Sequence, residues 1–251
     1  MKTNISFEKF LFFTSLFVFI FYFSLFVSLS LVFDWNFNIE YSRFLAALKN
    51  SFLAAILSIL LSSIFGIPTA YFLSRSKSNF SKIVDIVLEF PLIISPAALG
   101  ALIVISLNSL HFSSILFTFP AIVIAQFLTV LGVFIRVLKS SFDQIELEYE
   151  EMAWLLGANK FQTLFYILLP MARKGIISAI VLSFAKAFGE FGATFMVAGS
   201  IPYKTETIPI LLFLQLSSAQ ISQTAISILT LTLIGLITII VIKIDKNPPS
   251  K

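Results

Sequence analysis

Long stretches without a charged side chain dominate this chain and are separated by short polar segments. They cover residues 10–33, 50–74, 90–135, 175–199 and about 222–242. The stretch over 90–135 is long enough for two spans joined by a turn around 108–114, and the stretch over 175–199 is interrupted only by Lys186 and Glu190. A helix that crosses a bilayer needs about 20 mostly apolar residues. The pattern therefore predicts an all-α membrane protein with six transmembrane helices.

Composition agrees with this pattern and narrows the classes of function. Hydrophobic residues make up 58% of the 251 positions and charged residues 12%, whereas a soluble domain carries about 25% charged residues. An ordinary soluble enzyme is therefore excluded, and the net charge of +4 reflects membrane topology rather than a nucleic-acid partner. The chain has no cysteine and one histidine, which excludes a thiolate nucleophile and a Cys or His metal cluster. We expect no catalytic residues and no metal site.

The distribution of lysine and arginine predicts the orientation of the chain. With the amino terminus inside, thirteen of these cations fall on inner segments, and the outer loops hold only Arg43, Lys49 and Lys204. Inner loops of membrane proteins carry the excess of Lys and Arg. Both termini are therefore expected in the cytoplasm, and the chain in the cell (plasma or inner) membrane. The apolar run over 10–33 exceeds the roughly 7–15 residues of a signal-peptide core, so we expect a retained helix.

One inner loop, about residues 140–174, is long and mixes acidic, basic and apolar side chains. It reads Asp143-Gln-Ile-Glu-Leu-Glu-Tyr-Glu-Glu-Met-Ala-Trp-Leu-Leu-Gly157, then Ala-Asn-Lys160 and on to Pro170. The first part is rich in strong helix formers, and its acidic residues lie near the amino end, where the helix dipole favours them. Glycine commonly terminates a helix. We predict a short helix, a turn at Gly157 and a second helix from Lys160 to Leu169 along the membrane face.

The pattern Glu-x-Ala-x3-Gly-x9-Ile-x-Leu-Pro in this loop resembles the signature of the membrane subunits of binding-protein-dependent ABC importers. It is matched at Glu151, Ala153, Gly157, Ile167, Leu169 and Pro170. Met152 stands where the family usually has a second alanine, and methionine is apolar and adaptable. The resemblance implies the type I ABC importer permease fold. It also implies that the loop is a coupling helix that docks into a groove of an ATP-binding subunit.

Within the loop, four residues are the candidate coupling site. We expect Glu151 to accept a hydrogen bond or meet a cation, Ala153 to let a partner backbone approach, Trp154 to anchor in a pocket and Gly157 to permit the turn. Composition alone leaves another interpretation open, in which the glutamates of 146–151 are a solvated helix face. The chain has no G-x-x-x-x-G-K-[ST] phosphate loop. We expect it to need no cofactor of its own, with ATP and Mg²⁺ bound by the partner subunit.

The fifth predicted span, residues 175–199, carries small residues at every fourth position and two charges. Stripes of small residues predict close helix packing. One stripe consists of Gly175, Ala179, Ser183 and Ala187, and the second apolar stretch has another at Ser58, Ser62, Gly66 and Ala70. Lys186 and Glu190 are four residues apart, so in a continuous helix they lie side by side. They are either a self-compensating structural pair or part of the lining of a translocation pathway.

Residues 189–209 also resemble one group within that family, the molybdate and tungstate permeases. The similarity covers Gly189-Glu-Phe-Gly-Ala-Thr194, Ala198-Gly-Ser-Ile-Pro202 and Thr205-x-Thr207-x-Pro209, with further similarity at Gly66-Ile-Pro68 and Ser95-Pro96. Sulfate permeases share much of the Gly-Glu-Phe-Gly segment, and Lys186 stands where relatives commonly carry arginine. A tetrahedral dianion needs hydroxyl or amide donors along its path. Ser95 and Thr194 are therefore candidate lining residues, together with Lys186 and Glu190.

The resemblance implies an assembly and a division of the chain. A first helix and outer loop (1–43) precede the transmembrane domain (44–242), and a cytoplasmic tail (243–251) follows. The implied partners are a second copy of the chain, two ATP-binding cassette subunits, and an extracytoplasmic binding protein that meets the outer loops 34–50 and 200–218. Within the ABC importers, the alternative is a permease for sulfate or another small anion. The alternatives from other classes are a multi-pass membrane enzyme, and a channel or ion-coupled transporter that works alone. The alternative of a membrane enzyme lacks support, because such an enzyme needs several reactive groups inside the membrane and Glu190 is the one carboxylate inside a predicted span.

Overall fold

The computed structural model of the protein describes residues 3–32 and 40–246, and within these residues it contains helices and turns but no strand. The expectation of an all-α protein is confirmed. The longer helices are α1 (Thr3–Val32), α2 (Tyr41–Arg75), α3 (Asn79–Ile93), α4 (Pro96–Ser109), α5 (Phe119–Asp143), α9 (Arg173–Phe188) and α12 (Ile221–Lys246). The shorter elements are η1 (Ser113–Ile115), α6 (Glu148–Leu155), α7 (Lys160–Gln162), η2 (Thr163–Leu168), α8 (Leu169–Met171), α10 (Gly192–Ala198) and α11 (Ile208–Ser217).

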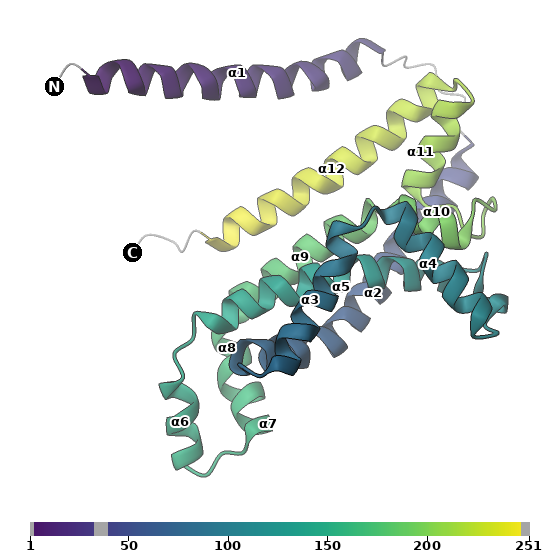
Figure 1. Cartoon of the computed structure of the whole chain (residues 1–251). Helices are drawn as coiled ribbons and strands as arrows, with labels where there is room; N and C mark the ends of the chain where they lie inside the picture. Colours follow the sequence, from purple (N-terminus) through teal and green to yellow (C-terminus); the bar gives the residue numbers. More distant parts are fainter. Residues whose placement is uncertain (1–2, 33–39, 247–251) are drawn as a thin grey trace.

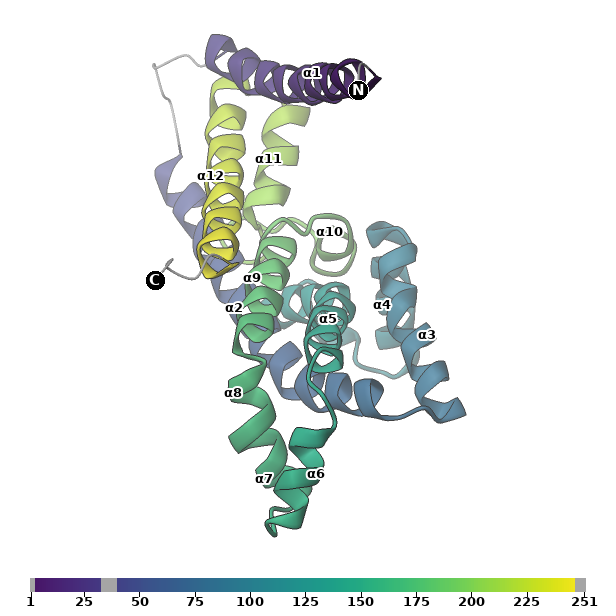
Figure 2. The same ribbon diagram turned by 90° about the vertical axis from the view of Figure 1, so that its left-hand side faces the viewer.

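Helix α5 lies at the centre, and α2 and α9 pack along it (Figure 2). On α2, the predicted stripe Ser58, Ser62, Gly66 and Ala70 is buried. A Cβ atom on Gly66 would come within 2.6 Å of the Phe134 ring on α5, so only glycine allows this approach. On α9, Ala179, Ser183 and Ala187 are buried as well. Both stripes therefore serve close helix packing, as predicted.

The third predicted span is not a straight helix. It is divided into α3 and α4, which meet at an angle of 115° across Ile94 and Ser95. The physical reason is local: Ser95 caps α4 by accepting the N–H of Ala98, and Pro96 cannot continue the hydrogen bonding of α3. The predicted turn around 108–114 is confirmed, because α4 ends at Ser109 and α5 begins at Phe119.

The fifth predicted span is also broken. Helix α9 ends at Phe188, and the short helix α10 begins only at Gly192. Among the described residues, α2, α5 and α12 are long and apolar enough to span a bilayer unaided, and up to five spans result if each bent pair counts as one. Six spans and the position of the termini therefore stay a prediction.

Two of the predicted outer loops are partly helical. Residues 41–50 are the first turns of α2, and 208–217 form α11. Residues 33–39 of the first of these loops, and 247–251 of the expected tail, lie outside the described residues. The apolar residues around Phe44, Leu48 and Ile208 explain the extension of both helices, because they pack into one cluster.

The molecule has two distinct ends (Figure 1). At one of them, here called the α6 end, α2 and α5 finish, α3 and α9 begin, and α6 to α8 project away from the bundle. At the other, the α11 end, α4 finishes, α2 and α5 begin, and α11 turns into α12. The cations at the α6 end are Arg75, Lys77, Lys82, Arg136, Lys139, Lys160, Arg173 and Lys174. Those at the α11 end are Arg43, Lys49 and Lys204.

Candidate functional site

The segment from α6 to α8 has the predicted helix–turn–helix form. Helix α6 ends at Leu155, and Gly157 follows with φ +90°, a left-handed backbone that side chains rarely adopt. The second helical piece starts with a capping box, in which Asn159 and Gln162 each accept the other's backbone N–H. The second piece widens into a π-helix over Thr163–Leu168, and the chain bends by 77° before α9. Gly157 therefore acts as the predicted terminator.

The tip of this segment exposes a group of large apolar side chains. They are Leu147, Tyr149, Met152, Trp154, Leu155, Leu156, Phe161, Phe165 and Tyr166. Leu155 is 86% exposed and Leu156 is 89% exposed. So many exposed large apolar side chains within one short segment are consistent with a docking surface. We call this group the apolar tip.

The four predicted coupling residues differ in where they point. Glu151 and Trp154 are exposed beside the apolar tip, and Gly157 has open space where a Cβ would stand. Ala153 is only 4% exposed, and its carbonyl accepts the N–H of Ala158. On the single chain Ala153 therefore offers little surface, and its expected contact with a partner backbone stays a prediction.

A buried acidic residue that sequence reasoning left among the solvated glutamates fixes α6 to the bundle. Glu150 is 1% exposed and accepts hydrogen bonds from Arg75 Nε at 2.5 Å and from the Tyr71 hydroxyl at 2.8 Å. Arg75 also donates from Nη2 to the Ile145 carbonyl at 3.0 Å. We call this set the inner clasp. The signal in the sequence is weak, since Tyr71 and Arg75 are spaced i, i+4 on a helix distant from the loop.

Two further ion pairs join α5 to α3 at the same end. Arg136 pairs with Glu89, and Lys139 Nζ lies 2.7 Å from Asp85 Oδ2. Both pairs are partly exposed, so each contributes little to stability. They lie beside the inner clasp without taking part in it.

Where the fifth span breaks, Glu190 caps a helix. Its Oε1 accepts the N–H of Ala193 at 2.9 Å, and the side chain is 6% exposed. The expected pair with Lys186 does not form: the ion pairs found among the described residues do not include it. The reason is that α9 ends before Glu190, so the i, i+4 geometry of a continuous helix is lost. Lys186 is exposed on the single chain.

The other two candidate lining residues lie near the same break. A Cβ on Gly192 would come within 2.9 Å of Pro96 Cβ, so the first residues of α10 and of α4 touch. Ser95 is exposed and caps α4. Thr194 is fully buried, and its hydroxyl has no hydrogen-bond partner among the described residues. Lys186 and Ser95 are therefore accessible from outside the chain, whereas Thr194 is not.

A second polar clasp lies at the α11 end. Arg43 donates to Glu206 from Nε at 2.8 Å and from Nη2 at 2.6 Å, and Glu206 is 1% exposed. Asn50 donates to the carbonyls of Lys204 and Glu206. At the next residue of α2, the Ser51 hydroxyl accepts the N–H of Ile208, the first residue of α11. We call this set the outer clasp.

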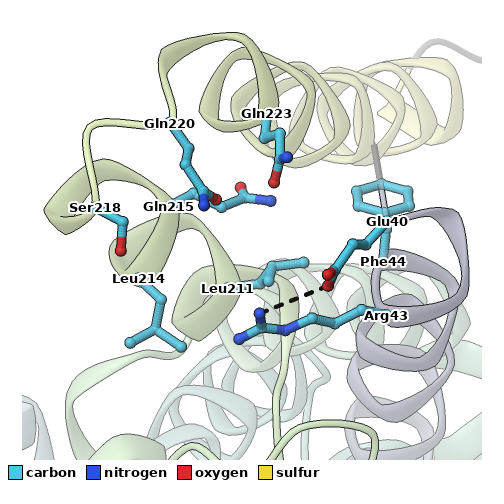
Figure 3. A pocket seen from close by; sticks show the side chains of 9 residues that line it. All are labelled: Glu40, Arg43, Phe44, Leu211, Leu214, Gln215, Ser218, Gln220 and Gln223. Atoms are coloured by element: carbon cyan, nitrogen blue, oxygen red, sulfur yellow. Dashed lines mark ion pairs between the residues drawn. The ribbon is translucent and has the colours of Figure 1, made fainter. Parts of the chain in front are cut away.

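Beside the outer clasp is a polar pocket of about 200 Å³ between α2, α11 and α12. Figure 3 shows Arg43 pointing toward Glu40 across this pocket, with Gln215, Gln220 and Gln223 on the facing side. Arg43 already pairs with both Glu40 and Glu206. Two carboxylates against one guanidinium leave the pocket with a net negative charge, so a dianion is disfavoured there.

This geometry agrees with the comparison with known families. Residues 62–246 match the model of the binding-protein-dependent transport system inner membrane component. The chain belongs to this family. Together with its apolar helices, this places the permease in the inner membrane as a multi-pass protein.

Relatives of this permease carry the names of transport permeases. The probable transport system permease protein NifC of Clostridium pasteurianum is 34% identical over 173 residues, which are 65% of this chain and 60% of that protein. The molybdenum transport system permease protein ModB of Azotobacter vinelandii is 30% identical over 71% of this chain and 84% of its own length. The sulfate transport system permease protein CysT of Salmonella typhimurium is 29% identical over 68% of this chain and 65% of its own. These names confirm that the chain is a permease subunit rather than an enzyme.

Solved structures show the same fold. One is a chain of a bacterial alginate ABC transporter, determined in complex with an alginate-bound periplasmic protein. It matches with a TM-score of 0.70 at 18% identity, and the match covers 97% of this permease and 93% of that chain. The methionine ABC transporter MetNI in an inward-facing conformation matches with a TM-score of 0.63 at 13% identity over 80% of this permease and 95% of that chain. The expected ABC importer permease fold is confirmed.

Proposed function

We propose that two copies of this permease form the membrane pathway of an ATP-driven importer for molybdate or tungstate. Two separate ATP-binding cassette subunits supply the energy, with ATP and Mg²⁺ bound entirely on them. An extracytoplasmic binding protein delivers the oxyanion at the α11 end. Family membership and the names of the relatives support the class of transporter, and the resemblance over residues 189–209 supports the cargo.

The observation that carries this proposal is the apolar tip. Trp154, Leu155 and Phe161 stand exposed at the end of the molecule where the cations gather, which the positive-inside bias assigns to the cytoplasm. A soluble protein that binds there would bury these side chains, and aromatic anchors surrounded by polar groups are typical of strong contacts. Glu151 lies beside them and offers a charge to the partner. We therefore assign α6 as the coupling helix.

Sulfate import is the second candidate, and a specific observation favours it. The sulfate permease CysT is 29% identical to this chain, close to the 30% of the molybdenum permease ModB. Sulfate and molybdate are both tetrahedral dianions, so the same donors along the pathway would serve either. We therefore assign the selection between sulfate and molybdate to the binding protein, so the anion that this protein binds identifies the cargo.

Reconstitution tests both parts of the proposal. The permease, its ATPase subunits and its binding protein are placed in lipid vesicles with ATP on the side of the apolar tip, and uptake of labelled molybdate, tungstate and sulfate is compared. We expect molybdate or tungstate uptake that requires ATP and the binding protein and is not competed by sulfate. Uptake without the ATPase subunits would overturn the mechanism, and uptake of sulfate alone would overturn the cargo.

A further inference from the structure

Helix α2 is tied at both ends to segments that are far from it in the sequence. It runs over 35 residues, about 52 Å at the usual rise, and continues without a break through Pro68. By contrast, the span that contains α3 and α4 and the span that contains α9 are both bent sharply. Helices α2 and α5 both join the two ends of the bundle without a break, and α2 is the longer of the two, so it suits the transmission of a displacement along its axis.

At the α6 end, the inner clasp is the attachment of α6 to α2. Within α6, only Glu150 and Ala153 are buried, and of these two only Glu150 has a side chain that can form hydrogen bonds. Glu150 is held by Tyr71 and Arg75, which belong to the last turns of α2, and Arg75 also holds the carbonyl of Ile145 in the linker before α6. A movement of α6 therefore reaches α2 through these hydrogen bonds, and it reaches α9 separately through the connecting chain.

At the α11 end, the outer clasp attaches the same helix to residues 204–208. Arg43 and Glu206 form a pair with two hydrogen bonds, Asn50 donates to two carbonyls of this segment, and Ser51 accepts the N–H of Ile208. The exposed residues Ile201, Tyr203 and Lys204 immediately precede the buried part of the segment. Contact of a partner with this surface therefore bears directly on the first turns of α2.

Stability alone does not account for these two clasps. Only 12% of the residues are charged, yet a carboxylate at 1% exposure is paired with an arginine at each end of the same helix. Burial removes most of the hydration of such a pair, so a buried ion pair has little net advantage over apolar packing. Its directional hydrogen bonds do fix one geometry, which is what a mechanical link requires.

We propose that α2 is a rod that carries the state of the α11 end to the coupling helix, with the inner and outer clasps as its two joints. This inference rests on the proposed function. It names α2 as the path by which the loaded binding protein at the outer surface acts on ATP hydrolysis. Tyr71, Arg75, Glu150, Arg43 and Glu206 are then positioning residues, which touch neither ATP nor the anion.

The test measures ATP hydrolysis by the reconstituted transporter with and without molybdate-loaded binding protein. In Glu150→Gln and Glu206→Gln, we expect the stimulated-to-basal ratio to fall by about fivefold or more, the range of ordinary coupling between sites. The double variant should lose no more than either single one, because the two joints act in series. The charge exchange Arg75→Glu with Glu150→Arg should restore part of the ratio. Glu89→Gln, in an exposed pair at the same end, is the matched control and should keep the full ratio.

The outcomes separate the rod from the proposed function. Wild-type protein that shows no stimulation by the binding protein would overturn the function itself. Single variants that keep full stimulation, or losses that multiply in the double variant, would overturn the rod and leave the function standing. If Glu150→Gln does not assemble with the ATPase subunits, Tyr71→Phe decides instead, because it removes one hydrogen bond of the clasp and keeps the ion pair. An undiminished ratio in Tyr71→Phe would then contradict the proposal.

Discussion

Gly157 is constrained by its own backbone rather than by its surroundings. Its φ of +90° is open to glycine, while a Cβ at this position would meet nothing within 4 Å. A substitution there therefore costs conformational strain and no steric clash. Gly66 is different, because a side chain at that position would clash with the Phe134 ring.

We predict that Gly157→Ala lowers ATP-driven transport, while Gly157→Asn retains most of it. Alanine in a left-handed conformation costs about 1–3 kcal/mol, and asparagine tolerates positive φ better. The strained turn would displace the apolar tip from its docking position. Uptake by vesicles containing the full transporter measures the effect, with ATPase co-purification as a second readout. Equal activity of the alanine and glycine proteins would show that the turn does not position α6.

Gln126 presents the opposite case, a buried polar residue without a visible partner. It is fully buried on α5, and neither its Oε1 nor its Nε2 has a hydrogen-bond partner among the described residues. An unsatisfied buried polar group costs about 1–3 kcal/mol. In the single chain, the amide therefore acts against stability.

We predict that Gln126→Met raises the thermal unfolding temperature of the purified permease by a few degrees, since methionine fills a similar volume without polar atoms. Differential scanning fluorimetry in detergent measures this shift. Gln144→Met is the control, because Gln144 is exposed and its substitution should change stability by no more than about 0.5 kcal/mol. A lower unfolding temperature for Gln126→Met would mean that the amide is bonded to a buried water molecule.

At the scale of elements, the small stripes were predictable and the helix breaks were not. A four-residue period of Gly, Ala and Ser indicates a packing face whatever the neighbour is, so the burial on α2 and α9 followed from spacing alone. The breaks depend on which local interaction is stronger. Ser95-Pro96 starts a new helix in the middle of an apolar run, and Glu190 caps α10 instead of pairing with Lys186. The inner clasp escaped prediction because Glu150 has the same local sequence character as the exposed glutamates beside it.

The contact between α9 and α5 gives a prediction at this scale. A Cβ on Gly175 would lie 1.8 Å from Ser141 Oγ and 2.3 Å from Ser141 Cβ, so one of the two helices must shift. We expect Gly175→Ala to destabilise the permease by about 1–3 kcal/mol, as overpacking usually does. Adding Ser141→Gly should recover part of this loss, because it removes both clashing atoms.

Gly235→Ala on α12 is the matched control for that pair, since a Cβ there meets nothing within 4 Å. It should leave stability unchanged or raise it slightly, because alanine is the better helix former. Unfolding temperatures of the four proteins test the set. No loss in Gly175→Ala would show that the two helices are further apart in the membrane, and a loss that Ser141→Gly does not reduce would show that it does not come from a clash with Ser141.

For the molecule as a whole, the arrangement of charge predicts the orientation of the chain in the membrane. The helix ends at Arg75, Asp143 and Arg173 share one end with α6, the proposed coupling helix, and eight lysines and arginines lie there against three at the α11 end. Under the positive-inside bias, that end faces the cytoplasm, where ATP is available. An importer needs this polarity: the ATPase must act from inside while the binding protein meets the α11 end from outside.

The absence of cysteine makes this orientation directly testable. Leu155→Cys places a thiol on the apolar tip, and Lys204→Cys places one on the exposed outer segment, both at exposed positions. A membrane-impermeant maleimide added to intact spheroplasts should label the Lys204→Cys variant at once. It should label the Leu155→Cys variant only after the membrane is permeabilised. The unaltered chain is the blank for both. Labelling of Leu155→Cys from outside would put the coupling helix on the wrong side for any cytoplasmic ATPase, and the importer mechanism would fail with it.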